Sequence, residues 1–281
     1  MVKLLLAFFL LFTFTFANDT TSQEREDFLT HKIKSFIDLD VYDKNRKFIE
    51  IIFSPKSKYY ANERVNVVKV ISTLKDNGLL NLYFKKPKEL NIHFKTSGSP
   101  LFFVKLMSDS LRNIGYYRYV TTASNLNNAE FTWSISLMSE YATDPQILQK
   151  ELLKSGCKIV NIERNSPTDW VYTVDMVSGY LNIQTLEAEK EVKLKRSLYA
   201  HWLNSSKIKE LRITSSSRNN WYPYIAYYDR KLHLLKVIKQ DDKCKDMFLN
   251  IPKCAKYIKI SDIYTLKNVK DELILYPSGS R

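Results

Sequence analysis

Glycine and proline are scarce in this chain, and long apolar runs are absent after the first seventeen residues. Only 6 Gly and 8 Pro occur among 281 residues, which leaves little room for long flexible linkers. No later apolar run approaches the roughly 18 residues of a transmembrane helix. The chain after the N-terminal segment is therefore expected to be soluble or only peripherally attached to a membrane.

Motifs of catalysis and cofactor binding are also missing. The sequence contains no Gly-x-Ser-x-Gly, no His-Glu-x-x-His and no phosphate-cradling glycine loop. Ser155-Gly156-Cys157 faintly resembles the cysteine motif of wall cross-linking transpeptidases, but it lacks the accompanying histidine. We therefore expect no enzyme, no cofactor and no metal site, and interpret Cys157 as a buried structural thiol. The histidines are scattered without metal-ligand spacing: His31, His93, His201 and His233.

The first seventeen residues have the pattern of a secretory signal peptide. Lys3 precedes an apolar run over residues 4–16, and Thr15-Phe16-Ala17 offers small residues for cleavage. The alternative is an uncleaved N-terminal anchor. The sequence thus predicts an exported protein of the periplasm.

The positive charge is large and unevenly distributed. The formal net charge is +13, and Gly179–Arg281 alone holds 20 Lys plus Arg against 11 Asp plus Glu, a difference of +9. An exported protein does not normally meet nucleic acid, so no nucleic acid partner is expected. A solvated basic surface is the plain interpretation. Contact with anionic lipid headgroups, acidic wall polymers or an acidic protein is the sharper one.

Two of the three cysteines are candidates for a disulfide. Cys244 and Cys254 bracket a short lysine-containing segment, and a bond between them would stabilise the fold by about 2–3 kcal/mol. Two reduced thiols are the alternative, because the Cα separation cannot be judged from sequence.

Residues 18–60 predict a helix followed by a hairpin. The helix is expected over residues 21–36, with Phe28, Leu29, Ile33 and Phe36 facing inward. Two strands, 37–42 and 48–53, are expected around the polar turn 43–46.

Residues 61–178 predict an α+β domain. Its first helix is expected after a cap at Asn62, with a strand as the alternative because the segment is rich in β-branched residues. The apolar stripe of this helix is Val67, Val70, Ile71 and Leu74. Strands over 79–84 and 89–95 follow.

Two units of the same pattern then occur in succession. Each has a proline-started helix, a glycine stop and two strands, the second of which opens on a tryptophan. Together with strand 89–95 they predict a β-α-β-β-α-β arrangement, ferredoxin-like or similar to ring-building domains; chance similarity is the alternative. The landmarks are Ser99-Pro100, Gly115 and Trp133 in the first unit, and Asp144-Pro145, Gly156 and Trp170 in the second.

Residues 179–281 predict a basic antiparallel β-sandwich. The helical period disappears, and short strands recur at nearly regular spacing. A short helix or connector is expected over 197–203. The expected strands are 181–184, 191–194, 208–214, 221–228, 232–238, 247–249, 257–260 and 272–275.

The densest aromatic segment lies in this region. In a strand, alternate residues face opposite sides, so half of these rings are expected in the core. The others are candidates for a protein interface or for stacking on sugar rings. The residues are Trp221, Tyr222, Tyr224, Tyr227 and Tyr228.

Several segments together resemble a known family. They are Leu-Lys-Asp-Asn-Gly-Leu-Leu-Asn-Leu (74–82), Thr-Ser-Gly-Ser-Pro-Leu-Phe-Phe-Val-Lys-Leu-Met-Ser-Asp (96–109), Ser-Glu-Tyr-Ala-Thr-Asp-Pro (139–145) and Trp-Tyr-Pro-Tyr-Ile-Ala-Tyr-Tyr-Asp (221–229). With the N-terminal signal, the chain resembles the periplasmic paralysed-flagellum family of campylobacterial Gram-negative bacteria, accessories of their enlarged flagellar motor. The resemblance implies a non-catalytic scaffold in the periplasmic disks, with disk and stator components as partners. The alternative from the residues alone is a module that binds peptidoglycan or another anionic glycan.

Overall fold

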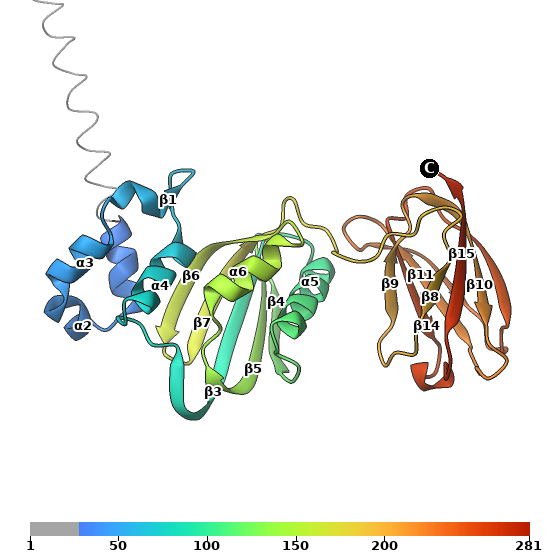
Figure 1. Ribbon diagram of the computed structural model, residues 1–281, viewed down its shortest axis with the longest axis horizontal. Coiled ribbons are helices and arrows are strands. Elements are labelled where there is room, and N and C mark those ends of the chain that lie inside the picture. Colours follow the sequence, from blue (N-terminus) through green and yellow to red (C-terminus); the bar gives the residue numbers. More distant parts are fainter. Residues whose placement is uncertain (1–27) are drawn as a thin grey trace, which may run out of the picture. The chain divides into compact units, whose positions relative to one another are not determined.

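The computed structural model describes residues 28–281, which divide into two compact units between Gly179 and Tyr180 (Figure 1). Unit 1 is the described chain up to Gly179, and unit 2 is Tyr180–Arg281. The chain is mixed α+β, with several sheets that are mainly antiparallel. The expected signal peptide, Met1–Ala17, lies outside the described residues.

Unit 1 begins with short helices. Residues 28–36 are helical, and α2 (Leu39–Lys44), α3 (Arg46–Ile52) and the 3-10 turn η1 (Lys56–Tyr59) follow. Leu29, Ile33 and Phe36 are buried as expected, whereas Phe28 is exposed.

The hairpin expected over residues 37–53 is therefore wrong. Asn45, read as part of its turn, lies between two helices, and its side-chain amide donates to the Val41 carbonyl at 2.8 Å. The buried residues Ile49 and Phe53 are four positions apart, which suits one face of a helix. A two-stranded hairpin without a third strand is only marginally stable, so packing of a helical face prevails here.

The helix expected next is confirmed, but its cap is a different residue. α4 spans Val67–Asp76, and the Asn66 side chain accepts the Lys69 backbone N–H at 3.1 Å. Asn62 instead lies, with φ of 47°, in the turn between β1 (Tyr60–Ala61) and β2 (Arg64–Val65). All four residues of the expected apolar stripe are buried.

A five-stranded sheet forms the centre of unit 1. Its order is β4-β5-β3-β7-β6. The strand expected over 89–95 lies within β3, whereas only the last two residues of the strand expected over 79–84 belong to β3 and residues 79–82 form no strand. The pairing of β3 with β5 is irregular between Tyr83 and Lys88, a segment that includes Pro87. The strands are β3 (Tyr83–Thr96), β4 (Val120–Leu126), β5 (Phe131–Tyr141), β6 (Lys158–Ser166) and β7 (Asp169–Asp175).

The repeated helix-strand-strand order is confirmed. α5 (Pro100–Asn113) precedes β4 and β5, and α6 (Pro145–Leu153) precedes β6 and β7. In each unit the second strand, which opens near a tryptophan, lies against the central strand β3. β5 runs antiparallel to β3 and β7 runs parallel to it.

The ferredoxin-like expectation is wrong in its last strand. That arrangement would place the strand after α6 beside β3, but β7 occupies this position and β6 lies at the edge. The reason is that β6 and β7 pair as a hairpin, and the strand with the more completely buried sequence takes the central place.

One face of this sheet carries the core of unit 1. Alternate residues of β3, Leu90, Ile92 and Phe94, are fully buried. The Phe94 ring lies 5.9 Å from Trp133 and 5.8 Å from Tyr172, centroid to centroid. α5 and α6 pack together, and Ile147 of α6 is exposed. The apolar side chains that the two helices supply to this core are Phe102, Phe103, Leu106, Met107, Leu111, Leu148 and Leu152.

Glu151 links the two helices. Asn113 of α5 donates to one carboxylate oxygen at 2.7 Å and Lys154 to the other at 2.6 Å. Burial alone would raise the pKa of Glu151, but these hydrogen bonds outweigh it and hold the pKa below its ordinary value of 4.5.

Glu151→Gln is expected to remove this stabilisation at neutral pH only. A lowered pKa in the folded state contributes stability that is complete above the ordinary pKa and is lost as the pH falls through the lowered pKa. We expect the variant to be about 1 kcal/mol less stable than the parent at pH 7, and nearly equal in acid. Urea unfolding at several pH values measures the difference. A gap that stays constant with pH would contradict it.

Unit 2 consists of two four-stranded antiparallel sheets. One has the order β13-β10-β15-β8 and the other β12-β11-β14-β9. The 3-10 turn η2 (Leu266–Asn268) precedes the last strand. The strands are β8 (Val192–Leu194), β9 (His201–Asn204), β10 (Ile208–Ser215), β11 (Pro223–Tyr228), β12 (Leu234–Lys239), β13 (Asp246–Asn250), β14 (Tyr257–Asp262) and β15 (Leu273–Ser280).

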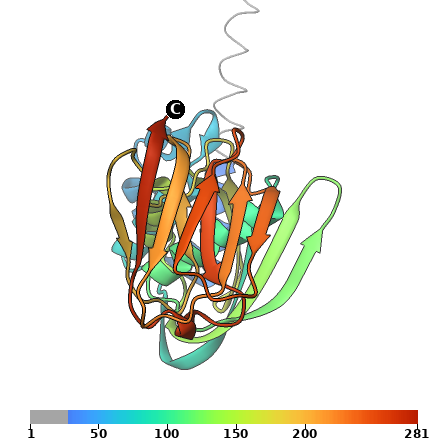
Figure 2. The same cartoon turned by 90° about the vertical axis from the view of Figure 1, so that its right-hand side faces the viewer.

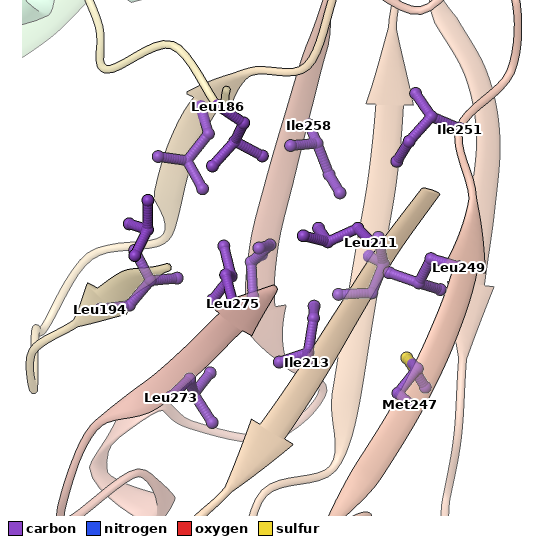
Figure 3. Packing of buried hydrophobic residues seen from close by; sticks show 14 of the residues in the cluster. Leu186, Leu194, Leu211, Ile213, Met247, Leu249, Ile251, Ile258, Leu273 and Leu275 are labelled. Carbon is purple, nitrogen blue, oxygen red and sulfur yellow. The ribbon is translucent and has the colours of Figure 1, made fainter. Parts of the chain in front are cut away.

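Side chains from both sheets meet in one buried cluster. Figure 3 shows Leu211, Ile213 and Leu275 from one sheet facing Ile258 from the other. Trp221 and Tyr227 belong to the same cluster and are fully buried.

The expected strands of unit 2 are confirmed with two exceptions. Residues 181–184 form no strand; Thr185 makes only an isolated bridge to Asn204. Residues 201–204, expected within a helix or connector, form β9. β9 is stabilised by pairing with β14, which lies more than fifty residues later and leaves no local signal.

Candidate functional site

The outward face of the β12-β11-β14-β9 sheet gathers aromatic rings and lysines. Ile225, Ile258 and Leu203 point into the core cluster, so the residues that alternate with them lie on the opposite face. The aromatic–lysine face, as we name it, consists of Trp202, Tyr224, Tyr228, Lys239 and Lys259.

The lysines of this face lie over its rings. The Lys259 Nζ is 5.8 Å from the Trp202 ring centroid and 5.6 Å from that of Tyr224. The Lys239 Nζ, which comes from β12 on the other flank of β11, is 5.4 Å from the Tyr224 centroid. Cation–aromatic contacts of this kind contribute about 0.5–1 kcal/mol at exposed sites. They hold the ammonium groups against the rings; Lys239 is exposed and Lys259 is half-buried.

The positive charge of this face is uncompensated within residues 28–281. No ion pair is found there for Lys239 or Lys259, and Asp262 is the only acidic residue in the four strands of this sheet. Asp262 is buried and accepts the backbone N–H groups of Tyr222, Tyr264 and Thr265. It therefore fixes a turn and does not neutralise the lysines.

The structure separates the five aromatic residues that sequence singled out. Trp221 and Tyr227 are core residues. Tyr224 and Tyr228 lie on the aromatic–lysine face, where the Tyr228 ring, itself buried, is 4.9 Å from Trp202. Tyr222 packs edge-on against Tyr264 at 5.1 Å.

Trp202 is the residue that sequence reasoning missed. Its segment was expected to be a helix or connector, so its side chain could not be assigned to a sheet face. The pairing of Lys259 with Trp202 in the β14–β9 ladder places it there. His201–Asn204 has only four residues, which is too few for the alternation of apolar and polar side chains to indicate a strand.

The Tyr227 hydroxyl is buried without a hydrogen-bond partner in the described part of the chain. Burial raises the pKa of this hydroxyl well above its ordinary value. Tyr227→Phe removes the unsatisfied group at nearly constant volume, so we expect unit 2 to gain about 1 kcal/mol of stability. Thermal unfolding of the variant tests this, and a clear loss of stability would contradict it.

The disulfide expected between Cys244 and Cys254 is wrong: both are free thiols. Lys245 pairs with Ser215 at one end of β10, and Ile251 pairs with Lys209 at the other. Six residues of β10 separate these points, about 20 Å of strand, whereas disulfide-bonded Cα atoms lie within about 7 Å.

Thiol labelling is expected to follow exposure. Cys254 is exposed and should react first; Cys244 is half-buried, and burial raises the pKa of its thiol, so it should react more slowly. Cys157 is fully buried, which raises the pKa of its thiol to about 11, and it should react only after unfolding. An Ellman assay with and without denaturant measures this. If the protein, unfolded without a reducing agent, showed only one reactive thiol, Cys244 and Cys254 would be disulfide-bonded after all.

Unit 1 contains one constellation of catalytic residue types. His93 of β3 lies 2.7 Å from the Ser134 hydroxyl through Nδ1, and its Nε2 is 3.5 Å from an Asp169 carboxylate oxygen. The three residues come from neighbouring strands, on the sheet face opposite the core. Sequence gave no sign of this, because the residues are far apart along the chain.

This constellation lacks the surroundings of a nucleophilic site. Ser134 is nearly buried and lies in the middle of β5, which is paired on both sides. The backbone N–H groups of such a strand are engaged in the ladders, so none is available there to stabilise an oxyanion. The histidine is best explained as a cross-strand polar contact.

No cluster of three or more metal-ligating side chains occurs among residues 28–281, and no helix in that range has the length and apolar character needed to cross a bilayer. The comparisons with known proteins add no relative: no family model matches the chain, and neither the curated proteins nor the solved structures gave a match. The aromatic–lysine face is therefore the candidate functional site.

Proposed function

We propose that this chain is a non-catalytic interaction protein of the periplasm, which binds an acidic partner protein through the aromatic–lysine face. The observation that carries the proposal is the placement of Lys239 and Lys259 over the rings of Trp202 and Tyr224. The two sheets of unit 2 would act as a β-sandwich, a rigid support for this face.

The chemistry of the face suits protein recognition. Tryptophan and tyrosine supply large contact areas at low cost in conformational entropy and are frequent among residues that dominate binding energy. Lysines held by rings lose less freedom on binding than free ones, so more of their attraction to carboxylates is retained. The formal net charge of +9 over residues 179–281 adds a long-range attraction for acidic surfaces.

The resemblance of the sequence to paralysed-flagellum proteins supports a particular setting. In this proposal the chain is a structural accessory of the flagellar motor disks, and disk or stator components present the acidic surface. Export to the periplasm by the N-terminal signal is part of the same proposal. Contact with a membrane would be peripheral at most.

A deletion strain tests this setting. Electron cryotomography of motors from the deletion strain, the parent and a strain complemented with Lys239→Glu/Lys259→Glu is the measurement. We expect lost motility and missing density in the periplasmic disk or stator region in the deletion, with incomplete rescue by the variant. Intact disks and normal swimming after deletion would overturn the motor proposal.

Glycan binding is a second candidate, favoured by the placement of Trp202 and Tyr224 on one sheet face, because aromatic rings can stack on sugars. Both residues are half-buried. Co-sedimentation with purified sacculi at low and high salt separates the candidates. Binding that survives high salt and is lost in Tyr224→Ala would favour the glycan, because purely ionic attraction is screened.

A further inference from the structure

We propose that β4 is an open sheet edge through which two copies of this chain join by antiparallel strand pairing. The inference concerns unit 1 alone and goes beyond the proposed function, because it requires neither the aromatic–lysine face nor its partner. The occupant of the edge would be β4 of the second copy.

β4 is almost completely exposed. Six of its seven residues are exposed and Ala123 is half-buried; Val120 and Leu126 at its ends expose 67% and 69% of their surface. β4 pairs only with β5, so its other side is unpaired in the described chain. Figure 2 shows the β4–β5 hairpin, in light green, reaching beyond the other strands of unit 1.

The sequence of this edge carries no charge. Residues 119–129 contain no Asp, Glu, Lys or Arg, although 26% of the chain is charged. Val, Thr and Thr at 120–122 favour the extended conformation. Exposed edges in natural proteins are normally guarded by charge, proline, shortness, a β-bulge or a covering element, because an unguarded edge accepts another strand. Of these, β4 has only the single irregularity between Thr121 and Ala123, which leaves Ala123–Leu126 regularly paired to β5.

The other sheet edges of the described chain are guarded. β6 carries Lys158, and Lys32 from the first helical segment donates to the β6 carbonyl of Ile162 at 3.4 Å. β12 and β13 carry charged residues, among them Lys239 and Asp246. β8 and β9 have only 3 and 4 residues. The open edge of β4 is thus an exception within the same molecule.

The outward hydrogen-bonding groups of β4 can be assigned. The Asn127 N–H bonds to the Glu130 carbonyl, so in the alternating antiparallel ladder Asn125 and Ala123 also bond to β5. Ser124 and Leu126 therefore direct their N–H and C=O groups away from the sheet. Thr122 lies at the irregularity between Thr121 and Ala123, where it has no partner in β5.

A second β4 fits this edge because it offers the same uncharged, unpaired groups. In such a pairing the outward-directed groups of one copy bond to the outward-directed groups of the other, and the register we propose places Ser124 on the two-fold axis. With Ser124 on the axis, Ser124 opposes its own copy and Leu126 opposes Thr122, so every pair is uncharged. Two chains of net charge +13 repel each other, so a contact between copies is least opposed along a neutral strand such as this one.

Sedimentation velocity of the full exported chain is the first test. The parent is expected to form dimers at about 100 μM, since a strand-sized interface lies at the small end of the range. Ser124→Pro removes only an outward N–H, and Ser124→Lys adds like charges at the axis; both should be monomeric, whereas Ser124→Thr should dimerise. Circular dichroism confirms that the variants fold. A monomeric parent, or a dimeric Ser124→Pro, would overturn the proposal.

Cross-linking locates the pairing independently. In a Cys244→Ser/Cys254→Ser background, Ser124→Cys places two thiols opposite each other at the axis and is expected to give a covalent dimer on oxidation. Asn125→Cys is the matched control. In the proposed register this cysteine lies opposite Ala123 of the second copy, and the corresponding cysteine of the second copy lies further along the strand, so a covalent dimer should form less readily. Equal cross-linking of both variants would show random collision and overturn the register.

Discussion

Replacing Trp221 by alanine is expected to destabilise unit 2 by about 3–5 kcal/mol. Trp221 is fully buried in the cluster shared by the two sheets, and its indole N–H donates to the Ser261 carbonyl at 2.9 Å. The substitution leaves a cavity and an unpaired carbonyl together. Since small domains are stable by only about 5–15 kcal/mol, much of unit 2 would unfold at moderate temperature.

Differential scanning calorimetry can assign this loss to unit 2. Trp170→Ala removes a buried tryptophan of unit 1, whose indole donates to the Pro167 carbonyl, and provides the matched control. We expect each substitution to lower a different transition. Tyr224→Ala, on the aromatic–lysine face, should cost less than about 1 kcal/mol. Equal losses for Trp221→Ala and Tyr224→Ala would contradict the assignment of Trp221 to the core.

The second large effect is expected from Lys239→Glu/Lys259→Glu. Reversing both charges on the aromatic–lysine face should weaken binding to an acidic partner about ten- to a hundredfold at physiological salt, and less at high salt. The fold should be preserved, because both ammonium groups lie on the outward face.

A matched variant separates the site from the overall charge. Lys209→Glu/Lys245→Glu changes the net charge equally, but Lys209 belongs to β10 and Lys245 directly precedes β13, both in the other sheet. Elution from immobilised polyglutamate measures both. We expect the Lys239/Lys259 variant to elute at lower salt than the Lys209/Lys245 variant. Identical elution would mean that only net charge matters and that the face is not a site.

Local signals in the sequence predicted the helices of unit 1 well. Pro100 and Pro145 begin α5 and α6, and Gly115 and Gly156, both with positive φ, follow them. Such starts and stops act through neighbouring backbone groups, so they are readable without knowledge of the fold. The failure at residues 37–53 arose where an asparagine-containing turn served two helices instead of two strands.

The positions of strands within sheets could not be predicted in the same way. That β7 lies beside β3, or that β9 exists, depends on pairing between segments far apart in the sequence. The aromatic–lysine face illustrates the consequence. Tyr224 and Tyr228 were identified from one dense segment, whereas Trp202, Lys239 and Lys259 join them only through the ladder of β9, β14, β11 and β12.

The place of β15 in its sheet has a consequence for the order of folding during synthesis. β15 is the last strand of the described chain, yet it lies inside its sheet, between β10 and β8. Arg281 continues this anchoring by donating to the carbonyls of Pro252 and Lys253. The contacts of β15 with β10 and β8 join segments that are far apart in the sequence, and contacts of this kind make folding slow.

Unit 2 therefore cannot close until Ser280 has left the ribosome. Until then β8 has no neighbour and one side of β10 remains open. Because β15 joins β10 to β8, the strands of this sheet that are synthesised first must wait for one that is synthesised much later. Loss of β15 would likewise separate β8 from β10, so copies cut before this strand are expected to be degraded faster than the full chain.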